Sequence, residues 1–451
     1  MDLLLKNGMV VLDGGVFLAD IGVRAGKIAA VAQPGSGLSA ETEVDCTGLH
    51  ILPGLIDTHA HFWEPGPENY REGYYHGTRC AAAAGVTTVI EMPLSVPPVV
   101  DAASHAGKLR AAQESAVVDF ALWGALIPAS VSQIEQLNEL GCVAYKGFMS
   151  FANPDYPHVT DDVLYTALEK TAAFDGLVGV HAENAYLADL FGRRMEAAGV
   201  TAAERYHEGR PPLVETEAIA RVVRLAEAAG SALYICHMCA DEGYDITAEA
   251  KARGQRVYTE TCPHYLLFDN TTMKKKGAFA KCNPPLRPAE NREKLWQRVL
   301  GGQVDCLGSD HGPYSDEEKM AEPSIWKALA GFAGMWGLLH VMLSEGYHKR
   351  GMLLAQIAKV TAGNAARIFG LRHKGCIRPG YDADFCVVDL DADWTFDGLK
   401  SFTKLHSSKG IYEDVPLKGQ VRATYVRGAR VYDGDEITVN AGWGQLVRRE
   451  V

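Results

Sequence analysis

Eight short apolar runs in the middle of the chain constrain its fold more than any other sequence feature. A helical stretch separates each run from the next, so strand and helix alternate. In the stretch 215–229, Ile219, Val222 and Val223 share one helix face, and Gly230 follows as a C-terminal stop. Eight such units predict an α/β fold, the (β/α)8 barrel. The predicted strands span residues 55–59, 87–91, 119–126, 143–149, 177–181, 233–237, 256–261 and 305–310.

The length of the chain agrees with one barrel and a smaller second domain. The 451 residues are two to three times the usual size of a single domain, and a barrel with insertions absorbs about 320 of them. A doubly wound sheet is the rival fold. It is disfavoured because no glycine-rich phosphate turn follows the first predicted strand.

Both ends of the chain have the alternating apolar and polar pattern of antiparallel strands. At the N-terminus, Asn7-Gly8 separates two such runs and predicts a tight hairpin, and residues 25–27 predict a second one. The same pattern returns at residues 383–389 and 423–432. We therefore predict a small β-sandwich domain built from residues 1–52 and 374–451, with the barrel formed by residues 53–373.

The composition of the chain limits the classes of molecule that it can bind. The net charge of −12 has the wrong sign for neutralising nucleic-acid phosphates or anionic lipid. The 10 cysteines are too sparse for a disulfide scaffold, and the first residues lack the basic start and apolar run of a signal peptide. We expect a cytoplasmic protein that acts on a small molecule and binds neither nucleic acid nor membrane.

Potential metal ligands follow several of the predicted strands. His59 and His61 point to the same side of the first strand, because side chains alternate along a strand. His181, His237 and Asp310 stand at the carboxyl ends of three later strands, the end at which barrel active sites are built. A single histidine there could be a buried hydrogen-bonded residue, but four histidines and an aspartate on one rim predict a metal site.

Lys146 is a cation on an otherwise apolar predicted strand. Beside metal ions its ammonium group would be repelled, so the amine should lose its proton, and a free amine can take up carbon dioxide to form a carbamate. The two carbamate oxygens could bridge two ions. Without the histidines, a lysine paired with a carboxylate at the rim would be the expected interpretation.

Taken in order, the predicted ligands resemble those of the binuclear amidohydrolase superfamily, in particular those of its cyclic amidases. These ligands are His59-x-His61, Lys146, His181, His237 and Asp310. The cyclic amidases comprise the allantoinases, the hydantoinases or dihydropyrimidinases, and the dihydroorotases. The resemblance extends over nearly the whole chain and includes the tail motifs 361–370 and 380–384. Within the group the sequence is most similar to allantoinases. The segments that carry this similarity are residues 64–66, 90–94, 261–265, 281–287, 305–311 and 324–328.

The resemblance implies two divalent metal ions per subunit, bridged by carboxylated Lys146 and by a hydroxide that acts as the nucleophile. His59 and His61 would bind one ion, His181 and His237 the other, and Asp310 would complete the first and serve as the acid-base catalyst. Imidazole and carboxylate ligands suit zinc, with manganese, cobalt and iron as alternatives. Relatives of this kind are commonly homotetramers.

The sequence departs from its relatives around the substrate. Trp63 stands where dihydroorotases place an arginine, and Phe151 where hydantoinases place an oxyanion-stabilising tyrosine. Gly312 replaces a serine that is frequent in allantoinases. We expect Trp63, Phe151, Asn283 and Gly312 to line the substrate pocket, with the second ion and a backbone N–H near Gly312 as the oxyanion donors.

The expected reaction is hydrolysis of a ring amide in a cyclic ureide, most simply allantoin to allantoate. Two aromatic residues at the pocket leave open a less polar substrate, as for a hydantoinase, a dihydropyrimidinase or a cyclic imide hydrolase. A mononuclear deaminase of the same superfamily is a more distant alternative, since it would not need Lys146.

Overall fold

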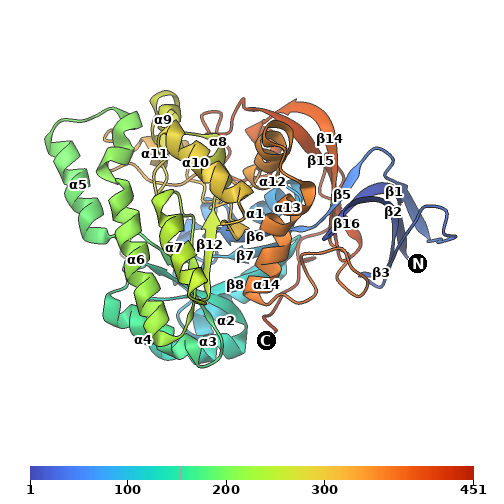
Figure 1. Ribbon diagram of the computed structural model, residues 1–451, viewed down its shortest axis with the longest axis horizontal. Helices are drawn as coiled ribbons and strands as arrows, with labels where there is room; N and C mark the ends of the chain where they lie inside the picture. Colours follow the sequence, from blue (N-terminus) through green and yellow to red (C-terminus); the bar gives the residue numbers. More distant parts are fainter. Residues whose placement is uncertain (153–154, 451) are drawn as a thin grey trace.

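The computed structural model describes residues 1–152 and 155–450 and contains a parallel eight-stranded sheet that curls into a barrel (Figure 1). Its strands are hydrogen-bonded in chain order from β6 to β13, and a parallel bridge between Ala60 and His311 brings the two edges together. Every residue of β6, β7 and β8 is buried, as expected for a parallel sheet that is covered on both faces. The predicted (β/α)8 barrel is confirmed. The strands are β6 (Leu55–Ala60), β7 (Val86–Glu91), β8 (Asp119–Ala125), β9 (Cys142–Phe148), β10 (Leu177–His181), β11 (Ala232–Ile235), β12 (Val257–Thr261) and β13 (Cys306–Leu307).

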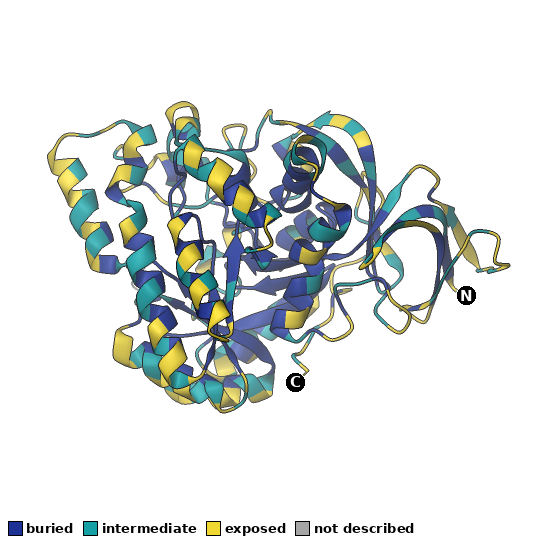
Figure 2. Cartoon of the chain, in the orientation of Figure 1, coloured by how far each residue is buried: buried dark blue, intermediate teal, exposed yellow. Residues whose placement is uncertain are grey.

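Helices surround this sheet with their buried faces inward and their exposed faces outward (Figure 2). Helix α6 ends as predicted, with Gly230 in the left-handed conformation at φ 69°. None of the described helices is long and apolar enough to cross a membrane. The helices are α1 (Gly73–Ala83), α2 (Ala102–Ser115), α3 (Ile134–Leu140), α4 (Asp161–Ala172), α5 (Ala185–Ala197), α6 (Pro212–Ala229), α7 (Glu242–Ala252), α8 (Pro263–Leu267), α9 (Asn270–Lys276), α10 (Ala289–Leu300), α11 (Asp316–Met320), α12 (Gly337–Val341), α13 (Leu354–Ala358) and α14 (Asn364–Phe369).

A second, mixed sheet contains strands from both ends of the chain, as predicted. Its order is β16-β15-β14-β5-β1-β2-β3, and β4 pairs with β1. The first four and the last three strands in the sequence are thus joined through β5, which pairs with both β1 and β14. The residue limits of the two domains stay a prediction. The strands are β1 (Leu3–Leu12), β2 (Gly15–Arg24), β3 (Lys27–Ala32), β4 (Thr42–Asp45), β5 (His50–Pro53), β14 (Phe385–Thr395), β15 (Pro416–Val426) and β16 (Ala429–Tyr432).

The hairpin predicted at Asn7-Gly8 is wrong. Strand β1 runs through this dipeptide, and the register with β2 shifts between Leu5 and Gly8. Asn7 has φ 59°, and its N–H donates to the Asp20 carboxylate at 2.8 Å. Asparagine tolerates the left-handed conformation in a β-bulge as well as in a turn, so the dipeptide alone does not distinguish the two. The turn predicted at residues 25–27 does join β2 to β3.

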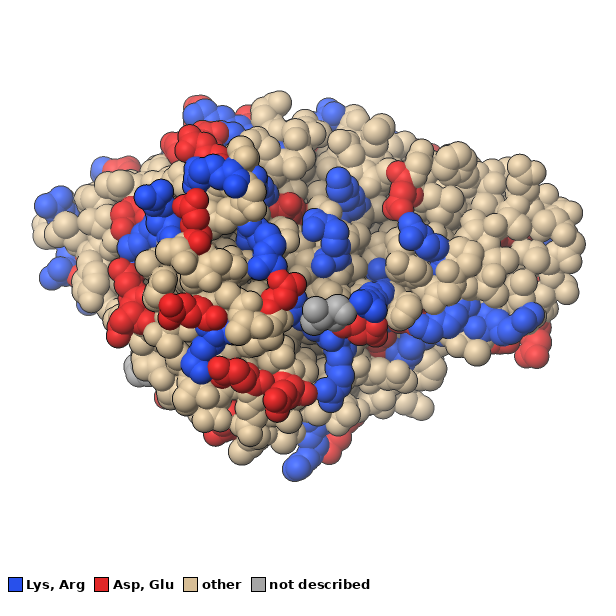
Figure 3. Space-filling model, turned by 60° about the horizontal axis from the view of Figure 1, so that its bottom comes forward, with Lys and Arg blue, Asp and Glu red and all other residues tan. Residues whose placement is uncertain are grey.

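The C-terminal segment returns to the barrel after β16. The N–H of Gly444 donates to the carbonyl of Ala116 at 2.9 Å, and the N–H of Val447 to that of Phe120 at 2.7 Å. A Cβ atom on Gly444 would lie 2.0 Å from the carbonyl oxygen of Val118, so this approach requires glycine. Over the barrel helices, the face in Figure 3 shows basic and acidic side chains intermingled.

Candidate metal centre

The six predicted ligands come from five strands and meet at one end of the barrel. Lys146 and His181 lie within β9 and β10, and His59 lies within β6 with His61 directly after it. His237 and Asp310 lie just beyond β11 and β13. The carboxyl ends of parallel strands form one rim, which is why residues so far apart in sequence converge.

His237 and Asp310 were predicted to end their strands, but both have turned out of the extended conformation. Their φ angles are 36° and 48°, in the left-handed region that residues other than glycine rarely adopt. Trp63, two residues after His61, has φ 61°. Such backbone conformations cost about 1–3 kcal/mol each and cluster at functional sites. The chain bends its backbone here to aim these side chains at the rim.

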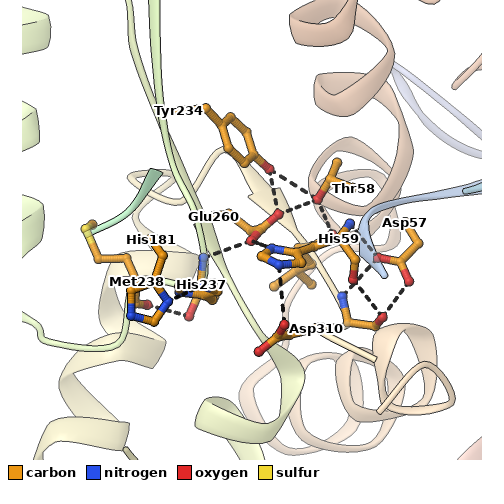
Figure 4. Close-up of polar contacts among 12 residues, drawn as sticks. Asp57, Thr58, His59, His181, Tyr234, His237, Met238, Glu260 and Asp310 are labelled. Carbon is orange, nitrogen blue, oxygen red and sulfur yellow. Dashed lines mark hydrogen bonds and ion pairs between the residues drawn. The ribbon is translucent and has the colours of Figure 1, made fainter. Parts of the chain in front are cut away.

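Asp310 joins the two histidines of the first strand. Its Oδ1 atom lies 3.3 Å from Nε2 of His59 (Figure 4). The same atom lies 3.3 Å from Nε2 of His61. These three side chains offer ligand atoms within 4.8 Å of one another, close enough to hold one ion. Burial raises the pKa of Asp310, but the two imidazoles outweigh it and hold the pKa well below its usual range. Asp310 is therefore ionised at neutral pH.

His181 and His237 form the second half of the centre. Nδ1 of His181 lies 3.1 Å from Nε2 of His237, and the His237 ring is 5.1 Å from that of His59. Burial lowers the pKa of His59 and of His237 well below the usual value of 6.5. Both imidazoles are therefore neutral at neutral pH, the form in which histidine binds metals.

Lys146 is fully buried among these histidines. Its Nζ atom has no hydrogen-bond acceptor among the oxygens and nitrogens of the described residues, and the Cys236 thiol is its polar neighbour. A buried ammonium without a counter-charge is unfavourable by several kcal/mol. The paired-lysine alternative is therefore wrong, and this amine suits a modification that replaces its positive charge.

A buried carboxylate that sequence analysis missed stands behind His59. Oε1 of Glu260 accepts a hydrogen bond from Nδ1 of His59 at 2.8 Å and another from the N–H of His237 at 2.8 Å (Figure 4). Its Oε2 accepts from the Thr58 and Tyr234 hydroxyls at 2.6 and 3.0 Å. Because Nδ1 of His59 is the donor, the lone pair of Nε2 is left to face the ion site.

A second carboxylate, also missed, holds His181. Nε2 of His181 donates to Glu183 at 2.8 Å, so the lone pair of its Nδ1 faces Nε2 of His237 and the ion site between them. Arg210 donates to the same carboxylate from the side of the cavity. Burial raises the pKa of Glu183, but Arg210 and His181 outweigh it and lower the pKa to about 2.

A cavity of about 430 Å³ opens above the ligands. Five of the six predicted ligands line it, all except Lys146, and so do the four residues predicted to contact substrate, which are Trp63, Phe151, Asn283 and Gly312. Besides Asp310, five charged side chains line the cavity, which are Glu68, Arg71, Arg210, Lys281 and Lys327. Sequence analysis assigned none of them to the site, although Lys281 and Lys327 lie in two of the segments that carry the similarity to allantoinases. The site thus combines four imidazoles, two carboxylates and four cations around a space large enough for a small ring.

The four predicted contact residues differ in their surroundings. Trp63 is 6% exposed and stacks on His61 at 5.6 Å, whereas Phe151 is 51% exposed at the mouth. The Asn283 side-chain oxygen accepts from the Tyr206 hydroxyl at 2.8 Å, so its amide NH2 stays available to a ligand. The N–H of Gly312 itself donates to the carbonyl of Phe332 at 3.0 Å, and the oxyanion donor expected near Gly312 stays a prediction.

Comparison with known proteins agrees with this architecture. The sequence pattern of the amidohydrolase family matches residues 50–431. The allantoinase of Rubrobacter xylanophilus is 41% identical over 451 residues, 99% of this chain and 97% of its own. The allantoinase of Solibacter usitatus is 39% identical over 447 residues, 98% and 96% of the two chains.

Among solved structures, the L-hydantoinase (dihydropyrimidinase) of Arthrobacter aurescens has a TM-score of 0.96 with 32% sequence identity. The match covers 99% of this chain and 100% of that one. A solved D-hydantoinase has a TM-score of 0.92 with 28% identity, covering 100% and 99%. The barrel, the sheet from both chain ends and the rim of histidines are thus explained by one ancestry: the chain belongs to the amidohydrolase family.

Proposed function

We propose that the protein hydrolyses a ring amide bond of a cyclic ureide, and that allantoin, opened to allantoate, is its substrate. The observation that carries the proposal is the buried Lys146, which is unpaired among the described residues and lies beside the four imidazoles and Asp310 that line the cavity. The relatives with 38–41% identity are allantoinases. The mechanism common to cyclic amide hydrolysis needs this donor set.

The donor set fits two divalent ions, for which we propose zinc. His59, His61 and Asp310 would hold one ion and His181 with His237 the other, and a carbamate on Lys146 would give the two ions a shared carboxylate. When bound, the ions supply a Lewis acid for the ring carbonyl and a water whose pKa falls to about 7. The carbamate also removes the uncompensated charge of Lys146.

The protein's own groups do the remaining work. Asp310 lines the cavity and is the carboxylate placed to take a proton from the attacking water and to return it to the ring nitrogen that leaves. Glu260 and Glu183 keep the imidazoles in the tautomers that bind ions. The amide NH2 of Asn283 is a donor for a ring carbonyl.

A second substrate class is favoured by one observation. The large ring of Trp63 forms part of the cavity wall, and Leu94 and Phe148 line the same space. Apolar walls suit a hydantoin or cyclic imide with an apolar substituent. The mononuclear deaminase reaction is disfavoured, because it leaves buried Lys146 without a role.

A hydrolysis panel tests the proposal. Allantoin, unsubstituted and aryl-substituted hydantoins, dihydrouracil and succinimide are incubated with protein whose metal content is measured on the same sample. We expect two ions per chain and the highest kcat/KM for allantoin. One ion per chain at full activity would refute the binuclear site, and turnover of a hydantoin with none of allantoin would refute the substrate. The homotetramer and the cytoplasmic location are further predictions, tested by light scattering and by cell fractionation.

A further inference from the structure

Residues 325–331 form one wall of the substrate cavity without belonging to a helix or a strand. Six of the seven, from Trp326 to Gly331, line the cavity. The exposed residues 321–323 precede the segment and connect it to α11. A wall of this kind has no ladder of backbone hydrogen bonds of its own, so other groups must hold its peptide carbonyls.

Lys281 holds the first half of this wall. Lys281 comes directly after residues 277–280, which follow α9, and only 3% of the residue is exposed. Its Nζ atom donates to the carbonyl oxygens of Ile325 at 2.7 Å, Ala328 at 2.5 Å and Trp326 at 3.3 Å. All three protons of the ammonium group are directed at this one segment.

Lys319 holds the second half from the opposite side. It lies on α11 and is 2% exposed. Its Nζ atom donates to the carbonyl oxygens of Leu329 at 2.9 Å and Gly331 at 2.8 Å. Two lysines from different parts of the chain thus bind five carbonyls of one seven-residue wall.

Neither lysine forms an ion pair with any described carboxylate, although both are buried. Buried cations normally have a carboxylate partner, as Lys108 has with Glu91 at 2.6 Å. Burial lowers the pKa of Lys281 and of Lys319 to about 7. The carbonyl dipoles of the wall are therefore what compensates the two charges, and the wall and the lysines depend on each other.

Lys281 also contacts a ring that packs against this wall. Its Nζ atom lies 4.7 Å from the centre of the Tyr206 ring, a cation–π distance, and the Tyr206 ring lies 5.4 Å from that of Trp326. The Tyr206 hydroxyl in turn donates to Asn283. Displacing Lys281 would therefore disturb the wall and the side chain of Asn283, while His59 and His181 keep their own carboxylate partners.

We propose that Lys281 and Lys319 are positioning residues that clamp the wall 325–331 and so set how closely the cavity fits its substrate. The inference rests on the proposed function for what the cavity holds. It concerns substrate binding rather than the chemical step, because neither lysine contacts a metal ligand through any hydrogen bond found in the described residues.

The test combines kinetics with proteolysis of Lys281→Met and Lys319→Met. Each variant loses charge-assisted hydrogen bonds, so we expect KM for the best substrate of the panel to rise about tenfold or more while kcat changes less than about threefold. We also expect trypsin to cut faster after Lys327, which lies in the wall and has 64% of its side chain exposed. Mass spectrometry of the fragments measures that cleavage without any substrate.

Lys275→Met is the matched control, because Lys275 is an exposed lysine at the end of α9 that forms no ion pair or hydrogen bond in the described structure. It should leave KM and cleavage unchanged. Folded Lys281→Met protein with wild-type KM and wild-type cleavage after Lys327 would overturn the clamp, as would a loss confined to kcat. If Lys281→Met does not fold, Lys319→Met decides by the same criteria. A protein without activity on any cyclic amide would refute the proposed function alone, since the proteolysis still tests the clamp.

Discussion

Two buried clusters of acidic and metal-ligating side chains lie at opposite ends of the barrel and differ in how their charges are compensated. One is the rim cluster of His59, His61 and Asp310. The other, here the base cluster, contains Asp119, at the start of β8, with Asp382 and Asp384. The ligand atoms of each set lie within 4.8 Å of one another. Geometry alone would make both of them metal sites.

The base cluster carries its own cation. Nζ of Lys374 lies 2.6 Å from Asp119, 2.7 Å from Asp384 and 3.1 Å from Asp382, and Arg427 also contacts Asp119. These residues come from the barrel, from the segment between α14 and β14, and from the turn after β15. The lysine takes the place that an ion would occupy, and the cluster fastens the mixed sheet to the barrel.

The rim cluster has no such internal cation partner in the described structure. Lys146, beside it, pairs with no carboxylate of the described residues, and within the same residues Nδ1 of His61 and of His237 are buried without hydrogen-bond partners. Unsatisfied buried polar groups are rare in proteins and call for an explanation. The difference shows that uncompensated charges and polar groups, and not the number of potential ligands, mark a buried cluster as a metal site.

Lys146→Met should have the largest effect on activity. Loss of the proposed shared ligand would remove several kcal/mol of transition-state stabilisation, so we expect kcat/KM to fall by about 10⁴-fold or more. In metal-free protein the same substitution should instead increase stability. Removing an unpaired buried amine should raise its free energy of unfolding by roughly 1 kcal/mol or more, measured by urea titration.

A variant with a smaller side chain tests whether residue 146 supplies carboxylate oxygens or only fills space. Lys146→Ala leaves room for a short carboxylic acid, whose two oxygens can replace those of a carbamate. Added propionate should restore part of the lost activity in Lys146→Ala but not in Lys146→Met. No recovery at any concentration of propionate, with both ions bound, would argue against a carboxylate at this position.

Asp310→Asn keeps the size of the side chain and removes the proton acceptor. Loss of general acid-base catalysis lowers rates by about 10²- to 10⁴-fold, so we expect kcat to fall within that range. Because Asp310 is also a proposed ligand, the measurement requires protein that retains both ions by elemental analysis. Metal-loaded Asp310→Asn within tenfold of wild type would remove Asp310 from the mechanism.

Lys374→Met makes the same substitution at the base cluster and should affect stability instead. It leaves buried carboxylates without their main partner, so we expect the free energy of unfolding to fall by about 3–5 kcal/mol. The folded fraction should keep wild-type kcat/KM. A large loss of kcat/KM in fully folded protein would contradict the division between the two clusters.

The pH dependence of this difference has a definite sign. The carboxylates outweigh burial and hold the pKa of Lys374 above its ordinary value of 10.5. A group whose pKa is raised on folding stabilises the protein below its unfolded pKa and loses that contribution as the pH rises through the folded value. The gap between wild type and Lys374→Met should therefore be complete at pH 7 and shrink in strongly alkaline solution.

Much of the fold and of the metal centre could be predicted from the sequence. The predicted ligands stand on, or directly after, the same apolar runs that predict the barrel strands. Apolar runs of strand length locate the barrel, and His181 ends one of them, so the rim follows from parallel topology. Glu260 was missed although it gave the same signal as Lys146, a charged residue on an apolar strand. Glu183 and Arg210 meet only through folding, because 26 residues, including the whole of α5, separate them. Asn7-Gly8 was misassigned because bulges and turns share one backbone conformation.

The smallest expected effect concerns the choice of substrate ring, which we expect to depend on Trp63. If its ring contacts the substrate, each methylene-sized apolar contact is worth about 1–3 kcal/mol, so Trp63→Ser should raise kcat/KM for allantoin relative to an aryl-substituted hydantoin by about tenfold. Phe151→Ser is the control, because Phe151 is half exposed at the mouth and should change this ratio less. The contact with His61 makes Trp63 the aromatic residue nearer the ions. An unchanged ratio in folded, metal-loaded Trp63→Ser would show that the ring only packs, and the choice between allantoin and a less polar ring would then depend on the wall that Lys281 and Lys319 hold.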